Sequence, residues 1–160
     1  MDKNYTPELF EKDIYNTWLN KGYFTTQPDG REHYSIVMPP LNVTGKAHIG
    51  HALDNTIQDI LIRTKRMQGF NTLWVPGTDH AAIATEQVLV KDLKRNGLSK
   101  EAVGREEFLK RGWDWYKKYT HVICDQLKML GVSCDWSRLA FTMDDNLNHA
   151  VRHVFCQYYN

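Results

Sequence analysis

Apolar residues recur at helical spacing in five segments of the chain, and two short runs between them are rich in strand-forming residues. Four of these segments are followed directly by a glycine, which is typical of helix ends because glycine adopts the left-handed conformation without strain. The predicted helices are 6–21, 50–68, 85–96, 105–130 and 142–160, and the predicted strands are 34–38 and 70–75.

Residues 34–75 follow the order strand, glycine-containing loop, helix and strand, which forms one βαβ unit. The two strands of such a unit lie parallel, and the crossover between them is right-handed in nearly all known cases. The sequence therefore predicts an α/β fold with an open parallel sheet and flanking helices.

The predicted helices each present an apolar stripe that we expect to face a core. The stripe of the first helix consists of Phe10, Ile14, Thr17 and Trp18, and that of the second consists of Leu53, Ile57, Ile60, Leu61 and Met67. At the start of the last helix, Thr142 and Asp145 match an acidic variant of the capping box, so we expect the Thr142 hydroxyl to cap that helix. Strand 34–38 is expected to be buried.

The composition is that of a globular protein, because 42% of the 160 residues are hydrophobic and 24% are charged, with 10 glycines and 5 prolines. These values exclude a disordered or collagen-like chain. A formal net charge of +1 gives no overall attraction to nucleic acid, membranes or acidic substrates. The three cysteines contain no Cys-x-x-Cys pair, and no apolar signal core or membrane-length run occurs, so we expect a cytoplasmic protein without a disulfide framework.

One segment of the chain, residues 91–118, holds nine basic residues against five acidic ones. Because the two signs alternate along the segment, a solvated helix surface is favoured over an RNA-binding one. An RNA-facing surface remains the alternative.

The loop that joins the first predicted strand to its helix, residues 39–51, concentrates groups that suit a phosphate. It follows the carboxyl end of a strand, where open α/β sheets bind ligands. Gly45 and Gly50 allow a ligand to approach the backbone, and the N-terminus of the following helix adds free amide groups and a partial positive charge. Lys46, His48 and His51 supply further donors. The loop is therefore predicted to bind a phosphate-containing ligand.

Three common alternatives fit this loop less well. A helical zinc-protease site needs histidines at i and i+4 with a glutamate between them, whereas His48 and His51 are three positions apart and flank Ile49 and Gly50. A metal site is disfavoured for that reason. Neither the P-loop pattern nor the dinucleotide-binding glycine pattern is present.

The loop also resembles a family signature. The sequence His48-Ile-Gly-His51 matches the first signature of the class I aminoacyl-tRNA synthetases, and the string from Pro39 to Gly45 is most similar to the valyl-type members. The other similar segments are Gly77-Thr-Asp-His-Ala81, Ile83-Ala-Thr85, Gly104–Phe108 and Asp135–Arg138. The resemblance covers nearly the whole chain and implies a Rossmann-like nucleotide-binding fold, of which this chain is the N-terminal half.

The resemblance implies an aminoacyl-tRNA ligase of the valyl type, in which ATP and valine form valyl-adenylate for transfer to tRNA. In this family the signature histidines contact the ATP phosphates, and an aspartate of the second block binds the ammonium group of the amino acid, helped here by the Pro39 carbonyl. The implied catalytic residues are His48 and His51, the ATP-binding residues are Thr44, Gly45, His48, Gly50 and His51, and the amino-acid-binding residues are Pro39, Asn42 and Asp79. Mg²⁺ is expected to accompany ATP, and neither a protein-held metal nor a membrane is implied.

The same resemblance divides the chain into an N-terminal helical segment, residues 1–33, and the first half of the catalytic domain, residues 34–160, truncated before the editing insertion. The second family signature, Lys-Met-Ser-Lys-Ser, does not occur in the 160 residues. Leu41, Ala82 and Glu86 depart from the usual family pattern. The alternatives are a non-catalytic nucleotide-binding fragment, an isoleucyl-type synthetase and a non-synthetase nucleotidyltransferase, the last disfavoured by the block around Asp79.

Overall fold

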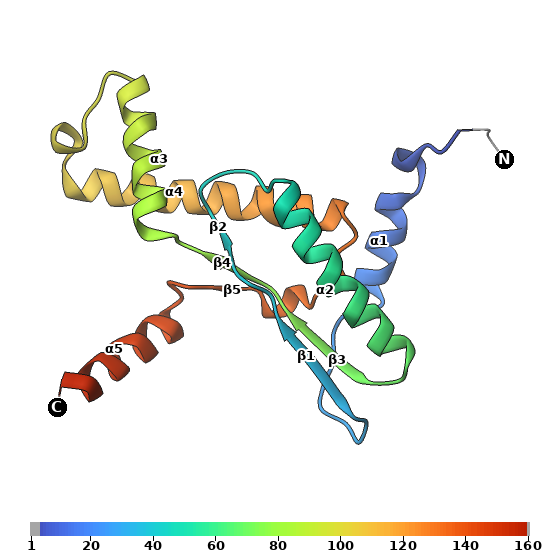
Figure 1. The fold of residues 1–160 in the computed structure, drawn as a ribbon. Helices are drawn as coiled ribbons and strands as arrows, with labels where there is room; N and C mark the ends of the chain where they lie inside the picture. Colours follow the sequence, from blue (N-terminus) through green and yellow to red (C-terminus); the bar gives the residue numbers. More distant parts are fainter. Residues whose placement is uncertain (1–3, 160) are drawn as a thin grey trace. The chain divides into compact units, whose positions relative to one another are not determined.

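A computed structural model describes residues 4–159, whose helices and strands are drawn in Figure 1. In chain order the elements are η1 (Pro7–Leu9), α1 (Glu11–Asn20), β1 (His33–Val37), β2 (Leu41–Asn42), α2 (Ile49–Met67), β3 (Asn71–Val75), β4 (Gly77–Asp79), α3 (Ala82–Arg95), α4 (Lys100–Met129), η2 (Trp136–Arg138), β5 (Ala140–Phe141) and α5 (Asp145–Tyr159). None of the helices in this part of the chain is long and apolar enough to span a membrane.

The chain forms two compact units that interleave in sequence. Unit 1 contains residues 4–38, 49–76 and 125–138, and unit 2 contains residues 39–48, 77–124 and 139–159. The chain therefore passes from one unit to the other several times, and the long helix α4 contributes residues to both.

Unit 1 is built around the parallel pair of β1 and β3, with α2 packed along both strands (Figure 1). Tyr34 pairs with Thr72 and Ile36 pairs with Trp74, so the predicted βαβ unit and its parallel strands are confirmed. The expectation of a buried first strand is wrong. Burial alternates along β1, and Val37 at its end is 75% exposed, because the sheet of unit 1 has only these two strands within the described residues.

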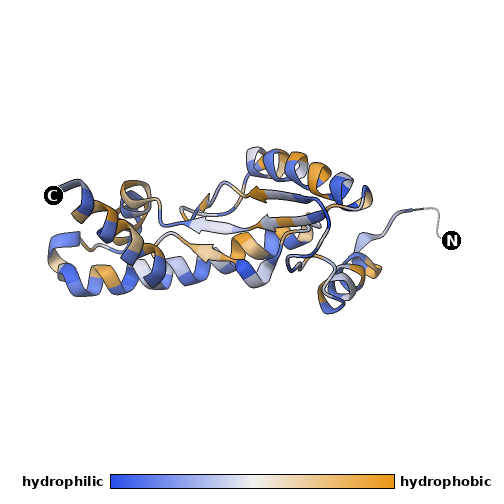
Figure 2. Ribbon diagram, turned by 90° about the horizontal axis from the view of Figure 1, so that it is seen from below, coloured by the Kyte–Doolittle hydropathy of each residue, from blue (hydrophilic) through white to orange (hydrophobic). Residues whose placement is uncertain are grey.

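Helix α2 has the predicted length, but it faces the core with the opposite side from the one expected. Its apolar stripe is exposed, with Leu53 at 62% and Ile60 at 58%, whereas Asn55, Gln58 and Ile62 are buried. Figure 2 shows hydrophobic and hydrophilic residues side by side along this helix. Part of this polar face is satisfied inside the core, because the side-chain oxygen of Gln58 accepts a hydrogen bond there from a buried indole N–H.

The first helix also differs from the prediction. It is interrupted at Phe10, which separates the short η1 turn from α1, and Thr6 makes no side-chain capping hydrogen bond. The residue that α1 buries is Tyr15, while Ile14 of the predicted stripe is 43% exposed. Gly22 has a φ of +65°, which confirms the predicted end of the helix.

Unit 2 contains a parallel sheet with the strand order β2–β4–β5, together with α3, most of α4 and α5. The strands are only two or three residues long, which explains why no sequence run announced them. Helix α4 breaks at Gly104, where φ is +76°, so its regular part begins at the predicted Arg105. The core of this unit is made by Leu41, Val43, Leu89, Leu93, Ile123 and Phe141.

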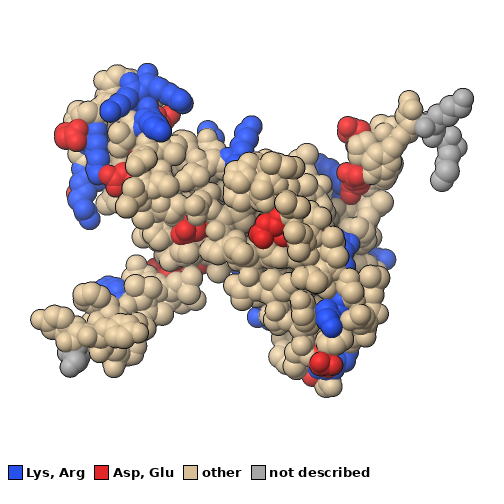
Figure 3. Space-filling view, in the orientation of Figure 1, with Lys and Arg blue, Asp and Glu red and all other residues tan. Residues whose placement is uncertain are grey.

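Lysine and arginine side chains gather over α3 and the beginning of α4 (Figure 3). Two of them have acidic partners within the same unit, since Lys100 forms an ion pair with Glu86 and Arg111 forms one with Glu107 across one helical turn. These pairs agree with the solvated, mixed-charge surface that the sequence favours.

Candidate functional site

The sheet of unit 2 brings together two of the residues that the sequence singles out for amino-acid binding. Strands β2 and β4 run parallel in a register that pairs Asn42 with Asp79. The backbone N–H of Val43 donates to the carbonyl oxygen of Asp79 at 3.0 Å, which extends the pairing one residue beyond β2. Asn42 and Asp79 therefore lie at the carboxyl ends of neighbouring parallel strands, the usual ligand-binding edge of an α/β sheet.

Close packing of the chain fixes this edge. A Cβ atom on Gly77 would lie 3.4 Å from the Cβ of Pro40 and 3.5 Å from the carbonyl oxygen of Ala140, which is van der Waals contact, so the segments on either side of β4 pack closely against it. On the other side of β2, the indole N–H of Trp115 donates to the carbonyl oxygen of Val43 at 2.8 Å and ties the loop to α4.

The Asp79 carboxylate is held by one of its two oxygens. Oδ1 accepts hydrogen bonds from the backbone N–H of Ala81 and from the hydroxyl of Thr142, both at 3.1 Å, and lies 3.3 Å from Nδ1 of His80. Among the contacts found for residues 4–159, none is made by Oδ2, and the side chain is 31% exposed. A part-exposed carboxylate that is anchored through one oxygen is suited to bind a cationic group of a ligand.

The turn after Asp79 has an unusual backbone. Ala81 and Ala82 have φ values of +51° and +30°, a region that is costly for residues with a side chain. The Thr85 hydroxyl donates to the carbonyl oxygen of His80 at 2.7 Å and closes the turn onto α3. Two adjacent strained residues beside a polar cluster are typical of a binding site.

The loop residues predicted to contact a ligand are divided between the two units. Pro39, Thr44, Gly45 and His48 belong to unit 2, where Pro39 and His48 are exposed and the other two are half-buried. The backbone does not require a glycine at Gly45, because its φ is not positive and its Cβ position is open.

Gly50 and His51 form part of the first turn of α2 in unit 1. The side-chain amide of Asn55 donates to the carbonyl oxygen of His51 at 2.8 Å within that helix. His51 lies in the first turn of α2, where the helix dipole favours anions. The structure places His48 and His51 in different units, each of which is described on its own.

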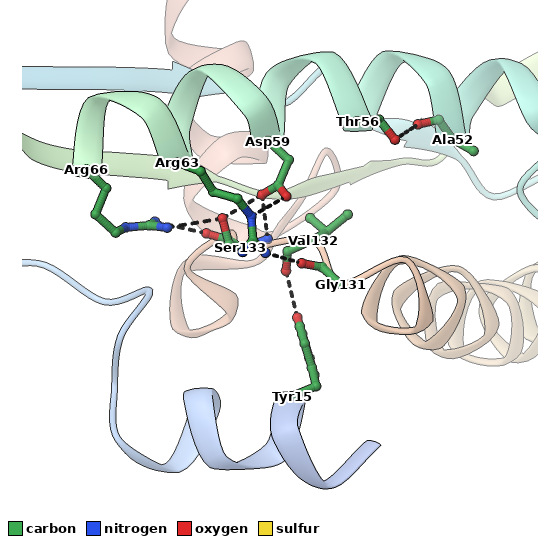
Figure 4. A network of polar contacts seen from close by, with 9 residues as sticks. All are labelled: Tyr15, Ala52, Thr56, Asp59, Arg63, Arg66, Gly131, Val132 and Ser133. Atoms are coloured by element: carbon green, nitrogen blue, oxygen red, sulfur yellow. Dashed lines mark hydrogen bonds and ion pairs between the residues drawn. The ribbon is translucent and has the colours of Figure 1, made fainter. Parts of the chain in front are cut away.

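A polar network that the sequence did not reveal holds α2 in unit 1 (Figure 4). Oδ1 of Asp59 accepts from the backbone N–H of Ser133 at 2.9 Å and from its hydroxyl at 2.5 Å, while Oδ2 accepts from Nε of Arg63 at 2.6 Å. Arg63 also donates to the carbonyl oxygen of Gly131 at 2.6 Å, and Arg66 donates to the Ser133 hydroxyl and carbonyl oxygen. Burial lowers the pKa of Arg66. The Asp59–Arg63 pair is local, but the contacts with Gly131 and Ser133 have no local signal because they join residues more than sixty positions apart.

Tyr15 links α1 to the same region. Its hydroxyl donates to the carbonyl oxygen of Val132 at 2.7 Å and accepts from the indole N–H of Trp136 at 2.8 Å. Burial is the main cause of a large increase in the pKa of this phenol. α1 and the segment around Val132 are thus joined by a buried hydroxyl that is satisfied as both donor and acceptor.

Within residues 4–159 no group of three or more histidine, cysteine, aspartate or glutamate side chains is placed to hold a metal ion.

Comparisons with known proteins agree with this picture. The chain is 54% identical over 155 residues to the valine–tRNA ligase of Carboxydothermus hydrogenoformans and 55% identical over 158 residues to that of Clostridium tetani. These matches cover 97% and 98% of the chain but only 18% of each relative, so the chain spans about a fifth of their length. Among solved structures it resembles the ternary complex of Agrobacterium radiobacter K84 agnB2 LeuRS with tRNA and LeuAMS. That match has a TM-score of 0.79 at 16% identity and covers 98% of this chain and 18% of the other, which shows a shared fold.

The family comparison covers more of the chain than any single motif does. Residues 13–160 match the family described as tRNA synthetases class I (I, L, M and V). This range includes the parallel strands, the loop from Pro39 to His51 and the Asp79 turn. The chain therefore belongs to the class I tRNA synthetases.

Proposed function

We propose that this chain supplies the ATP-binding and valine-binding part of a valine–tRNA ligase, which joins valine to ATP as valyl-adenylate and transfers it to tRNA. The observation that carries the proposal is the pairing of Asn42 with Asp79 at the ligand-binding edge, in a chain 54% identical to a valine–tRNA ligase. In this proposal residues 34–160 are the first part of the catalytic domain and residues 1–33 are a helical segment that precedes it.

Asp79 is the proposed anchor for the amino acid. Its Oδ2 accepts a charge-assisted hydrogen bond from the ammonium group of valine, with the Pro39 carbonyl oxygen as a second acceptor. Pro39 and Asn42 shape the space for the valine side chain. This assignment needs no change in the contacts of Oδ1, because these are already satisfied by the protein.

The proposed ATP-binding residues follow one another along the chain after β2 and into the first turn of α2, namely Thr44, Gly45, His48, Gly50 and His51. The amide groups at the helix N-terminus and the two imidazoles bind phosphate oxygens. Attack of the valine carboxylate on the α-phosphate needs no general base because the nucleophile is already ionised. The protein therefore acts by aligning the two substrates and by stabilising the charge that develops on the phosphoryl oxygens, with His48 and His51 as donors. Mg²⁺ would enter with ATP as part of the substrate.

Calorimetric titration of the full-length gene product with ATP and with valine separates the proposed ATP-binding role from the proposed valine-binding role. The double variant His48→Ala/His51→Ala is expected to weaken ATP binding at least tenfold and to leave valine binding within about twofold, since each lost charge-assisted hydrogen bond costs about 1.5 kcal/mol or more. Asp79→Ala is expected to have the opposite effect. His153→Ala, on the exposed surface of α5, is the matched control. Unchanged ATP affinity in the double variant, or unchanged valine affinity in Asp79→Ala, would contradict the assignment.

A further inference from the structure

The residue that faces Asp79 directly after β5 is Thr142, which the sequence marks as a helix cap. In the structure its hydroxyl does not cap α5 but donates to Oδ1 of Asp79 at 3.1 Å. Its backbone N–H donates to the carbonyl oxygen of Thr78 at 3.1 Å and extends the parallel pairing of β4 and β5 by one residue. The sheet thus fixes the backbone of Thr142 beside that of Asp79.

The Thr142 hydroxyl is a branching point for hydrogen bonds. Its oxygen accepts from the backbone N–H of His80 at 3.0 Å and lies 2.6 Å from Nδ1 of the His80 ring. A hydroxyl has a single proton, and here that proton is directed to the Asp79 carboxylate. With the hydroxyl proton on that bond, Nδ1 of His80 is the donor in its contact with Thr142. These contacts orient the His80 ring, which also packs edge-on against Phe141 with ring centroids 6.4 Å apart.

These contacts have a consequence for the carboxylate. Thr142, His80 and the backbone N–H of Ala81 all meet Oδ1 of Asp79 or the hydroxyl bound to it, so rotation of the carboxylate about its Cβ–Cγ bond would break several hydrogen bonds at once. The second oxygen, Oδ2, is thereby held in one direction. A carboxylate that is already oriented loses less conformational entropy when it binds a cation.

We propose that Thr142, supported by His80, is a positioning residue for amino-acid binding, and that it acts by orienting Asp79 toward the ammonium group of the substrate. The inference rests on the proposed function, because it takes the ligand of Asp79 to be that ammonium group. Thr142 itself touches only the protein.

The inference is tested in the full-length gene product with two analogues of valine, each of which lacks one of its charged groups. Valinol carries the ammonium group without the carboxylate, and 3-methylbutanoate carries the carboxylate without the ammonium group. Both are measured as competitors of valine in the valine-dependent exchange of pyrophosphate into ATP. Thr142→Val removes the hydroxyl at nearly constant shape, and Thr142→Ser keeps it.

The expected result is selective for the ammonium group. In Thr142→Val the inhibition constant of valinol rises by up to about tenfold, because Asp79 loses a hydrogen bond that orients it, while that of 3-methylbutanoate and the KM for ATP stay within about twofold. Thr142→Ser behaves like the unchanged protein. Equal weakening of both fragments in Thr142→Val would show a general structural role, and unchanged valinol inhibition would show no role; either result overturns the inference.

A second pair of variants covers the case in which Thr142→Val does not fold. His80→Asn keeps a donor near the position of Nδ1, and His80→Leu removes it. We expect weaker valinol inhibition in His80→Leu alone, by about threefold, and an equal effect of both replacements would overturn the inference. Failure of the proposed function gives a different pattern, since valinol would then not compete in the unchanged protein or Asp79→Ala would leave its inhibition unaltered.

Discussion

Replacement of Asp59 by alanine is expected to destabilise unit 1 by about 3 kcal/mol. The change removes the acceptor for the backbone N–H and hydroxyl of Ser133 and for Nε of Arg63. Ser133 is fully buried, so its N–H loses its partner out of reach of water, which costs about 1–3 kcal/mol. The ion pair with Arg63 adds less, about 1 kcal/mol, because the Arg63 side chain is 36% exposed and solvent screens the interaction.

Urea unfolding followed by circular dichroism measures this loss. In a domain of this size, each kcal/mol of lost stability lowers the melting temperature by about 2–4 °C. A parallel thermal scan should therefore show a melting temperature about 6–12 °C lower in Asp59→Ala. Asp54→Ala is the matched control on the same helix, where the aspartate is exposed and accepts a hydrogen bond from Gln58, and it should cost less than about 1 kcal/mol. A loss below about 1 kcal/mol in Asp59→Ala would refute the view that this network holds α2 in place.

Three further outcomes are expected for the chain. Tyr15→Phe removes the hydroxyl that bonds to Val132 and Trp136 and should lower the free energy of unfolding, measured in urea, by about 2 kcal/mol. Tyr23→Phe, at an exposed tyrosine, is the control, and an equal stability of the two variants would contradict the buried contacts. Folding raises the pKa of Tyr15 above 10.0, so its contribution to the free energy of unfolding is complete below pH 10 and declines as the pH rises further. Above pH 10 the stability of Tyr15→Phe should therefore fall less steeply than that of the unchanged protein. Equal slopes in a pH series would contradict this. Ala82→Gly relieves a residue with φ of +30° and should raise stability by about 0.5–1 kcal/mol after the entropy cost of glycine, and a lower melting temperature would be the contrary result.

The sequence predicted the elements of this fold better than their orientation. The boundaries of the βαβ unit could be predicted from the glycine after α2 and from the strand-forming runs on either side of the helix, because these signals are local. The prediction of which side of α2 faces the core was wrong. Periodicity distinguishes the two faces of a helix, but it does not identify the inner face when polar side chains have buried partners. Gln58 and Asp59 point inward for that reason, toward Trp74 and Ser133.

In the candidate site, too, local features could be predicted from the sequence and contacts between distant residues could not. Asp79 and Asn42 were named from the family resemblance, and their adjacency depends on strands too short to be recognised in the sequence. Thr142 has the local pattern of a helix cap, but its hydroxyl bonds to a residue 63 positions away, which no local rule predicts. The roles of these residues in ligand binding stay predictions.

The most direct test of the account is valine-dependent exchange of pyrophosphate into ATP by the polypeptide as its gene encodes it, measured with and without Asp79→Ala. Adenylate formation is reversible, so exchange reports activation of the amino acid without tRNA. The account predicts exchange that depends on valine and a loss of at least about a hundredfold in kcat/KM for valine in Asp79→Ala, because the ammonium group loses its charged partner. Exchange supported equally by other amino acids, or unchanged by Asp79→Ala, would contradict it.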